Sequence, residues 1–252
     1  MRVWWMAALL LLALPAPAQA YRPFDGTDAD VASFGQVELE LGAFGWLHQD
    51  RHNAVVAPAL VANYGFLPRL ELVLEGKQFV FTDAVPDQSR VQLLDTAISV
   101  KAVLRAGVLH DQSGPSVAVE GSVLLPETGA SHPGGELAAI VSGRAGGLTV
   151  HGNLALAFTR EGNAAGFVGV IVEGPATWMV RPVGEVFFAR ENPGATEGSA
   201  LAGAIGRVFE NLSLDAAVRL AHVSDGGATQ TAWEGRLGLT WAFEVLGHGR
   251  RR

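Results

Sequence analysis

The sequence predicts an all-β fold, a transmembrane antiparallel up-and-down β-barrel of about 12 strands that follows a cleaved signal peptide. Twelve stretches alternate between a face that carries charges and an apolar face, which is the two-residue period of a strand. In the last stretch, Trp233, Leu237 and Trp241 share one side, whereas Glu234 and Arg236 share the other. We expect lipid to contact the first side and water to contact the second.

The lengths and connections of these stretches also fit a membrane barrel, whose tilted strands need about 9–11 residues. We predict strands at 36–47, 54–66, 69–81, 90–105, 115–125, 136–143, 147–158, 166–174, 178–190, 200–208, 212–222 and 233–243. Connections such as 143–147 and 209–211 are tight. The alternate ones are mostly longer and polar, including 82–89, 126–135, 191–199 and 223–232. Outer-membrane barrels combine short periplasmic turns with longer external loops, although the long connection 106–114 departs from this rule.

Outward-facing aromatic residues collect at the strand ends, as they do in the two interfacial belts of membrane proteins. With this topology, the periplasmic belt contains Tyr64, Phe66, Trp178, Trp241 and Phe243, and the outer belt contains Phe158, Phe188 and Trp233. A soluble barrel is the alternative, but stretches 54–66 and 166–174 carry almost no charge on either face. Lysine occurs only at 77 and 101, which also argues against a soluble exterior.

The N-terminus has the pattern of a secretory signal. Arg2 precedes an apolar run from Trp4 to Leu14, and Ala18-Gln19-Ala20 forms a small-x-small cleavage site. A retained membrane helix is the alternative, but prolines at 15 and 17 shorten the run below the roughly 20 residues that a span needs. The predicted parts are a signal peptide at 1–20, an outer-membrane barrel at 21–243 and a short C-terminal tail at 244–252.

Composition excludes several classes of protein and partner. The chain has no cysteine, which excludes disulfides and thiolate metal sites. Its net charge of -7 argues against nucleic acid. Histidines at 48, 52, 110, 132, 151 and 248 are scattered, and no glycine-rich phosphate loop opens a helix, so we predict no metal and no cofactor. The expected partners are outer-membrane lipid and small-molecule solutes, with the oligomeric state left open.

The inward face carries both signs of charge, which predicts either a polar passage or a lumen filled by paired charges. The predicted lumen-lining residues are Glu38, Glu40, Glu71, Glu75, Lys77, Asp95, Lys101, Arg105, Glu120, Arg181, Glu185, Asp215, Arg219, Glu234 and Arg236. Eight-stranded barrels are filled by side chains, whereas 16–18 strands enclose a channel. We therefore expect a narrow or occluded lumen. Pro58 and Pro182 fall inside predicted strands, where a missing N–H requires a bulge, a strand end or a rim position.

One short segment has the residue types of a hydrolase. His222-Val223-Ser224-Asp225 resembles the His-x-Ser-Asn element of outer-membrane lipid hydrolases, with Ser224 as nucleophile and His222 as base. Asp225 replaces the expected Asn, and Glu234 has inward parity, away from His222. The alternative is a strand end that runs into a polar loop, so we predict no catalytic residues and no enzyme.

Motifs along nearly the whole mature chain resemble a family of bacterial outer-membrane proteins labelled transporters or proteins of phenol (meta-pathway) degradation. They are Arg22-Pro23-Phe24 with Thr27–Asp30, Gly35–Glu40, Leu94-Asp95 with Lys101, Leu124-Leu125-Pro126, His151–Leu154, Gly184-Glu185 and Gly238–Phe243. The resemblance implies an outer-membrane barrel that takes up small, often aromatic or hydrophobic compounds, and it brings no catalytic residues.

The leading hypothesis is therefore a barrel in the bacterial outer membrane through which small, hydrophobic or aromatic solutes pass. Two alternatives remain open: a lipid hydrolase that uses Ser224 and His222, and a closed structural barrel without a transport role.

Overall fold

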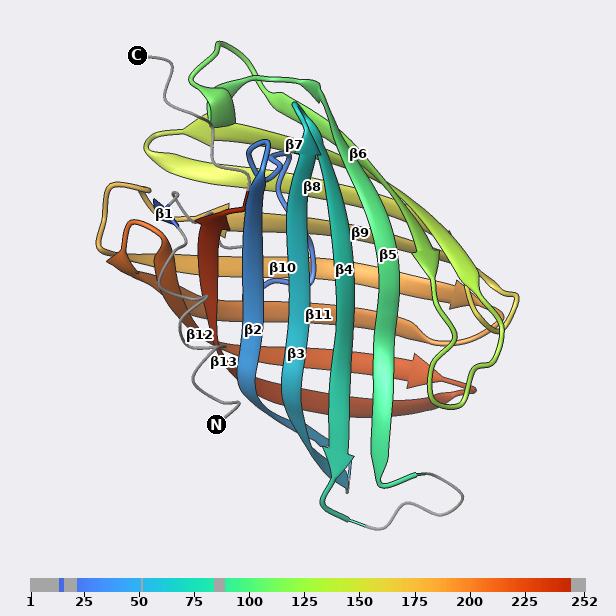
Figure 1. Ribbon diagram of the computed structural model, residues 1–252. Coiled ribbons are helices and arrows are strands. Elements are labelled where there is room, and N and C mark those ends of the chain that lie inside the picture. The colour runs from blue at the N-terminus through green and yellow to red at the C-terminus, as the bar shows by residue number, and fades with distance from the viewer. Residues whose placement is uncertain (1–13, 16–21, 51, 84–88, 246–252) are drawn as a thin grey trace, which may run out of the picture.

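Twelve long antiparallel strands form a closed barrel in the computed structural model, which describes residues 14–15, 22–50, 52–83 and 89–245 (Figure 1). Each strand pairs with its neighbours in sequence, and β13 pairs with β2 to close the sheet. The barrel strands are β2 Gln36–Gln49, β3 His52–Leu67, β4 Leu70–Phe81, β5 Val91–Arg105, β6 Ser116–Leu124, β7 Gly134–Ala145, β8 Leu148–Phe158, β9 Ala164–Glu173, β10 Val180–Asn192, β11 Thr196–Phe209, β12 Leu212–Asp225 and β13 Ala228–Glu244. Closure leaves no sheet edge along the barrel, as a bilayer requires.

All twelve predicted strands are present, and most of their ends lie within about two residues of the predicted positions. Two predicted long loops, 191–199 and 223–232, are wrong because the strands continue through them. Residues 193–195 alone connect β10 to β11. A two-residue turn, Gly226-Gly227, connects β12 to β13, and both glycines have positive φ angles of 54° and 85°. Such a turn matches the twist of a hairpin, so the pairing extends to its tip.

The end of the barrel where β2 begins and β13 ends is called the proximal end here, and the opposite end is the distal end. The proximal turns are short between β3 and β4, β7 and β8, and β11 and β12. The exception at 106–114 is confirmed: the β5–β6 connection is long and contains the 3-10 helix η1, Val108–His110. Short turns also occur at the distal end, between β2 and β3 and between β12 and β13, so turn length alone does not distinguish the two ends. The assignment of the proximal end to the periplasmic side stays a prediction of the sequence-based topology.

The two prolines inside strands lie where a ladder bond is absent. At Pro58, the β2–β3 pairing is interrupted, and the β3–β4 register shifts between Val56 and Ala59, which is a bulge. Pro182 lies near the proximal end of β10 and pairs with Ala204 of β11, beyond the last residue of the β9 ladder. Neither proline therefore removes a hydrogen bond from a continuous ladder.

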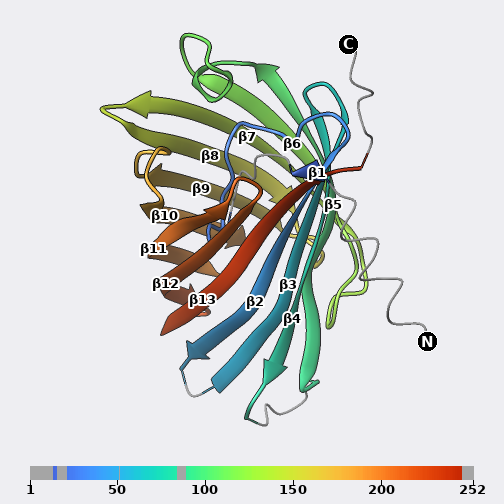
Figure 2. The same ribbon diagram turned by 60° about the vertical axis from the view of Figure 1, so that its left-hand side comes forward.

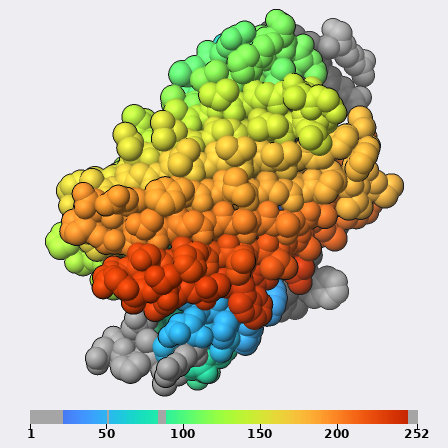
Figure 3. Space-filling model, turned by 180° about the vertical axis from the view of Figure 1, so that it is seen from behind, coloured from blue at the N-terminus to red at the C-terminus, as the bar shows by residue number. Residues whose placement is uncertain are grey.

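The outer surface of the barrel is apolar, and Figure 3 shows an unbroken wall over β8–β13. Large aliphatic side chains such as Leu74, Leu137, Leu154 and Leu156 point outward and are exposed. Near the proximal end of β13, the rings of Trp241 and Phe243 lie 4.8 Å apart, as expected for an interfacial belt. Among the described residues, no helix has the length and hydropathy needed to span a bilayer.

An N-terminal segment inside the barrel was not predicted. Residues 22–35, called the plug below, precede β2 and lie within the ring of strands in the proximal half (Figures 1 and 2). The plug contacts side chains of β4, β7, β8 and β10 on the opposite walls. The lumen is therefore occluded, but by a chain segment rather than by wall side chains alone.

The predicted signal peptide and tail fall largely outside the described residues. Within 1–20, only β1, Leu14–Pro15, is described, and it pairs with Glu244 and Phe243 of β13. In the tail, β13 includes Glu244, and the amide of Val245 donates to the carbonyl of Gly35 over 2.8 Å.

The two faces of β4 should respond differently to a charge. Leu74→Arg places a guanidinium on the lipid face, where it should cost about 2–4 kcal/mol of stability. Val73→Arg places the same group on the luminal side beside Glu71 and Glu75 and should be tolerated. The fraction of protein that migrates as a folded barrel on unheated gels measures both variants. Equal losses of folded protein would mean that the faces are assigned wrongly.

Candidate functional site: the lumen and its plug

The wall holds the plug mainly through its backbone. Glu185 of β10 accepts hydrogen bonds from the amides of Asp25 and Gly26 over 2.8 and 2.7 Å. Asn153 of β8 binds both polar groups of Thr27, accepting from its amide over 3.0 Å and donating to its carbonyl over 2.9 Å. These contacts satisfy buried amides that a strand ladder would otherwise pair.

Two further contacts fix the second half of the plug. The amide of Ala29 donates to Ser142 Oγ over 2.9 Å, and the amide of Ala32 donates to Glu71. Ala29 also packs in a fully buried apolar cluster with Ala118 and Ile140. The plug is thus held by wall groups on several strands rather than by one contact.

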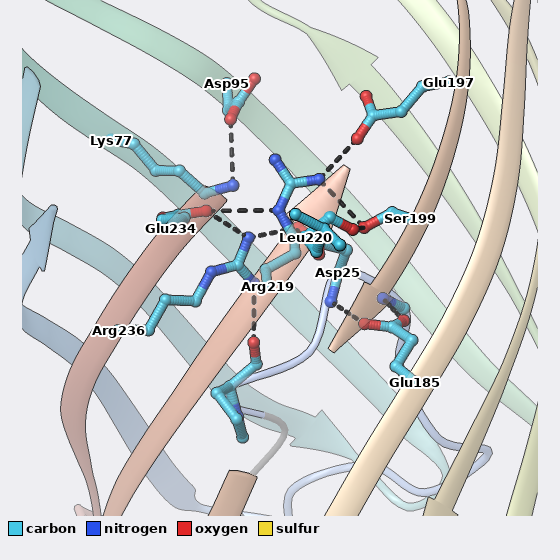
Figure 4. Close-up of polar contacts among 12 residues, drawn as sticks. Asp25, Lys77, Asp95, Glu185, Glu197, Ser199, Arg219, Leu220, Glu234 and Arg236 are labelled. Atoms are coloured by element: carbon cyan, nitrogen blue, oxygen red, sulfur yellow. Dashed lines mark hydrogen bonds and ion pairs between the residues drawn. The ribbon is translucent and has the colours of Figure 1, made fainter. Parts of the chain in front are cut away.

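Ion pairs join plug side chains to the wall. Asp25 Oδ1 lies 3.0 Å from Arg236 Nη2, and Asp25 Oδ2 lies 4.0 Å from Arg219 Nε (Figure 4). Burial raises the pKa of the Asp25 carboxyl, but the charges of Arg236 and Arg219 outweigh it and hold the pKa below its usual value. Asp25 therefore remains a carboxylate at mildly acidic pH.

The same two arginines are also paired with carboxylates of the wall. Glu234 Oε2 lies 2.8 Å from Arg236 Nη2 and 3.4 Å from Arg219 Nε, and Glu197 Oε1 lies 2.5 Å from Arg219 Nη1. These five residues, Asp25, Glu197, Arg219, Glu234 and Arg236, are called the arginine cluster. Each guanidinium of the cluster thus has at least two carboxylates within 4.0 Å, as buried cations require partners.

A second buried network lies on the β7–β9 wall. His151 Nδ1 lies 2.7 Å from Ser142 Oγ, and His151 Nε2 lies 3.0 Å from Glu173 Oε1. Glu173 Oε2 in turn accepts from Arg181 Nε over 2.7 Å. Ser142 Oγ also accepts from the amide of Ala29, so this chain of hydrogen bonds ends at the plug. Ser142 and His151 are almost completely buried, so this serine, histidine and glutamate lack access for a substrate.

Above the plug, the lumen contains a cavity of about 530 Å³. Its floor includes Phe24, Asp25 and Thr27 of the plug, and its wall reaches Gln49 and Glu197 near the distal strand ends. In the described part of the chain, nine carboxylates and five cationic side chains line it. The cavity is therefore enclosed by the barrel, closed toward the proximal end by the plug, and acidic overall.

Ten of the fifteen predicted residues lie along this cavity: Glu40, Glu71, Glu75, Lys77, Asp95, Lys101, Glu120, Arg219, Glu234 and Arg236. Glu185 is buried against the plug. Asp215 is also buried, and its Oδ2 lies 3.5 Å from Arg22 Nε. Glu38 is buried and accepts from Gln36, and Arg181 pairs with Glu173. Arg105 differs, because it is exposed and donates to the carbonyl of Ser113 in the proximal β5–β6 connection. A function of these residues in passage stays a prediction.

Several residues of the site were not predicted. Glu197 was assigned to a loop that proves to be part of β11. Ser142, His151 and Asn153 share the inward parity of their strands, so a search for uncharged polar side chains on that face would have found them. Asp25 lies in a segment without periodicity, and nothing in its local sequence places it in the lumen.

The residues of the proposed hydrolase site do not come together. His222 and Ser224 lie on β12 near its distal end, and His222 is exposed, 3.5 Å from Thr231 Oγ1. Glu234 points into the lumen and binds the two arginines of the cluster. His222 therefore lacks this carboxylate as an orienting partner, which a serine nucleophile with a histidine base requires.

Comparison with known proteins defines the fold class. No protein-family model matches the chain, and no curated protein sequence matches it. Among solved structures, an outer membrane channel from Pseudomonas putida has a TM-score of 0.60 at 9% identity, covering 87% of this chain and 100% of that one. The KdgM porin in complex with disordered oligogalacturonate has a TM-score of 0.56 at 14% identity, covering 82% and 99%. The CymD monoaromatic hydrocarbon channel has a TM-score of 0.50 at 8% identity, covering 92% and 94%.

The chain is thus an outer-membrane β-barrel of the twelve-stranded type, and its place is the bacterial outer membrane. The solved structures named above are channels. At identities this low, the likeness establishes the fold and leaves the substrate to be argued from the lumen.

The arginine cluster should contribute to stability. Glu234→Gln removes the carboxylate that both arginines share and should lower the free energy of unfolding by about 1–3 kcal/mol. Glu161→Gln, in the exposed β8–β9 connection, is the matched control and should have little effect. Urea unfolding in detergent micelles measures both. The role assigned to the cluster is wrong if the two variants unfold at the same urea concentration.

Proposed function

We propose that this barrel mediates the passage of small solutes across the outer membrane, with the luminal cavity as part of their route. The observation that carries the proposal is the luminal cavity of about 530 Å³ above the plug. Cavities of roughly 300–1,000 Å³ hold small molecules in proteins of known function.

The charges of the cavity favour cationic or neutral solutes. Each of its five cationic side chains forms an ion pair, including Lys77 with Asp95 over 3.0 Å and Lys101 with Asp28 over 3.7 Å. On the facing β4, β6 and β7 wall, Glu75, Glu120 and Glu136 form no hydrogen bond or close ion pair with the described residues, although Lys101 is the cross-strand neighbour of Glu120. These carboxylates are free to interact with a solute, and carboxylate-lined pores favour cations.

Apolar side chains complete the wall and support a solute with a hydrophobic part. The rings of Phe167 and Phe187 lie 5.0 Å apart and face the cavity, and Phe79 and Val73 line it on the opposite side. The guanidinium of Arg219 lies 5.9 Å from the centre of the Phe187 ring. Aromatic surfaces of this kind stack on planar groups.

The structural neighbours are consistent with more than one solute class. CymD is a channel for monoaromatic hydrocarbons, and the KdgM porin was solved with oligogalacturonate. The acidic cavity here disfavours an acidic oligosaccharide by like-charge repulsion. The proposed class is therefore small neutral or cationic compounds with an apolar or aromatic part.

Passage can be tested in lipid vesicles and planar bilayers. We expect small, sporadic conductance with a preference for cations, and swelling with small neutral or cationic solutes. The triple variant Glu75→Gln, Glu120→Gln and Glu136→Gln should lower the cation preference at least about twofold without unfolding the barrel. Glu161→Gln, outside the cavity, should leave it unchanged. A large, steady conductance would refute the occluded lumen, and silence toward every ion and solute would favour the structural barrel.

A further inference from the structure

We propose that the inner wall of the barrel is a binding site for the chain's own residues 22–32, and that reversible release of this segment opens the solute route. The inference rests on the proposed function for its role in passage, but the binding site itself is a separate claim. The described residues define both the ligand and the groups that bind it.

The wall recognises the segment by its backbone, as a peptide-binding site does. Five wall side chains accept hydrogen bonds from plug amides: Glu40, Glu71, Ser142, Asn153 and Glu185. They come from β2, β4, β7, β8 and β10, so the segment is held on opposite walls of the lumen. Hydrogen bonds to individual side chains exchange more easily with water than a continuous strand ladder does, because no neighbouring ladder bonds hold them together.

The segment is tethered at one end. Gly35 has a positive φ of 81°, its amide donates to the carbonyl of Gly65 over 2.7 Å, and its carbonyl accepts from Val245 over 2.8 Å. These bonds fix the start of β2 at the proximal rim. Within residues 22–32, the contacts with the wall described above all involve a side chain. Once the predicted signal peptide, which includes β1, is removed, this stretch can turn about Gly35 without disturbing the barrel ladder.

Arg219, Arg236 and Lys101 of the wall keep carboxylate neighbours when the segment leaves. Arg219 retains Glu197 and Glu234, and Arg236 retains Glu234. Lys101, which loses Asp28, pairs in register with Glu71 on one side and Glu120 on the other. Release therefore leaves each of these three cations beside a carboxylate, whereas Asp215 loses its ion pair with Arg22 of the segment.

Release also removes the floor of the cavity. Arg22, Phe24, Asp25, Gly26 and Thr27 form its proximal lining. Without them, the space above the plug continues into the proximal half of the lumen. The segment is accordingly the gate of the route, and the bound state described here is the closed one.

A reversible disulfide crosslink between the segment and the wall tests the gate. The chain has no native cysteine, so only the two introduced cysteines can form a disulfide within it. Ala29 and Ser142 are adjacent, because Ser142 Oγ lies 2.9 Å from the Ala29 amide nitrogen. In the double variant Ala29→Cys and Ser142→Cys, oxidation should lower solute flux at least about fivefold, and reduction should restore it. Each single variant is the control and should not respond to oxidation or reduction.

A substitution that adds one methyl group is the opposite test, because it displaces the segment instead of holding it in place. A Cβ at Gly65 would lie 2.1 Å from the carbonyl oxygen of Ser33, so Gly65→Ala must displace the plug. Gly121→Ala, which adds a methyl with no atom within 4 Å, is the matched control. Gly65→Ala should raise flux and should speed labelling of an Ala29→Cys variant by a membrane-impermeant maleimide, about tenfold in each case. The mobility of each variant on unheated gels measures whether it remains folded.

The outcomes separate the gate from the proposed function. Flux that is unaffected by the crosslink and by Gly65→Ala would overturn the gate and leave passage intact. If the cysteine introduced at position 29 is labelled slowly in the folded Gly65→Ala variant, the claim that the segment can leave its binding site is wrong. Fast labelling without any flux would refute passage through the lumen and with it the function of the gate. Flux that falls on oxidation and rises in Gly65→Ala supports both.

Discussion

The structure depends on one constraint: ionised groups inside a closed barrel need partners, because neither lipid nor a sheet edge can supply them. Pairing of β13 with β2 closes the wall and turns alternate residues of every strand inward. The interior then has to compensate many charges at once. It does so through wall-to-wall pairs, such as Arg236 with Glu234, and through a second source, the plug, whose Asp25 and amides complete the network.

This constraint divides the interior into two regions with different properties. On the plug side, polar groups are matched, as Glu185 shows by accepting two amides. Across the cavity, Glu75, Glu120 and Glu136 form no hydrogen bond or close ion pair with the described residues, and they border open space. Polar groups that have hydrogen-bond or ion-pair partners stabilise the fold. Carboxylates without such partners, which line the cavity, are available to bind a solute. The proposed route and the proposed gate are therefore two consequences of the same charge distribution.

The sequence predicted the wall better than the contents of the lumen. Period-two alternation is a local signal, so all twelve strands and most inward charges could be found from it. The hairpin tips at 193–195 and Gly226-Gly227 were missed because polar residues beyond the membrane continue the strand without an apolar face to reveal it. The plug has no period at all. Its contacts join residues more than 100 positions apart, as between Ala29 and Ser142, and nothing in residues 22–35 encodes them locally.

The central claim is that residues 22–32 lie bound inside the barrel, and amide hydrogen exchange tests it most directly. Exchange measured residue by residue on the folded protein in detergent reports whether each plug amide is bonded. The account predicts that the amides of Asp25, Gly26, Thr27, Ala29 and Ala32 exchange at least about 100-fold more slowly than in a free chain. Exchange of these five amides at free-chain rates, beside protected strands β2–β13, would contradict it.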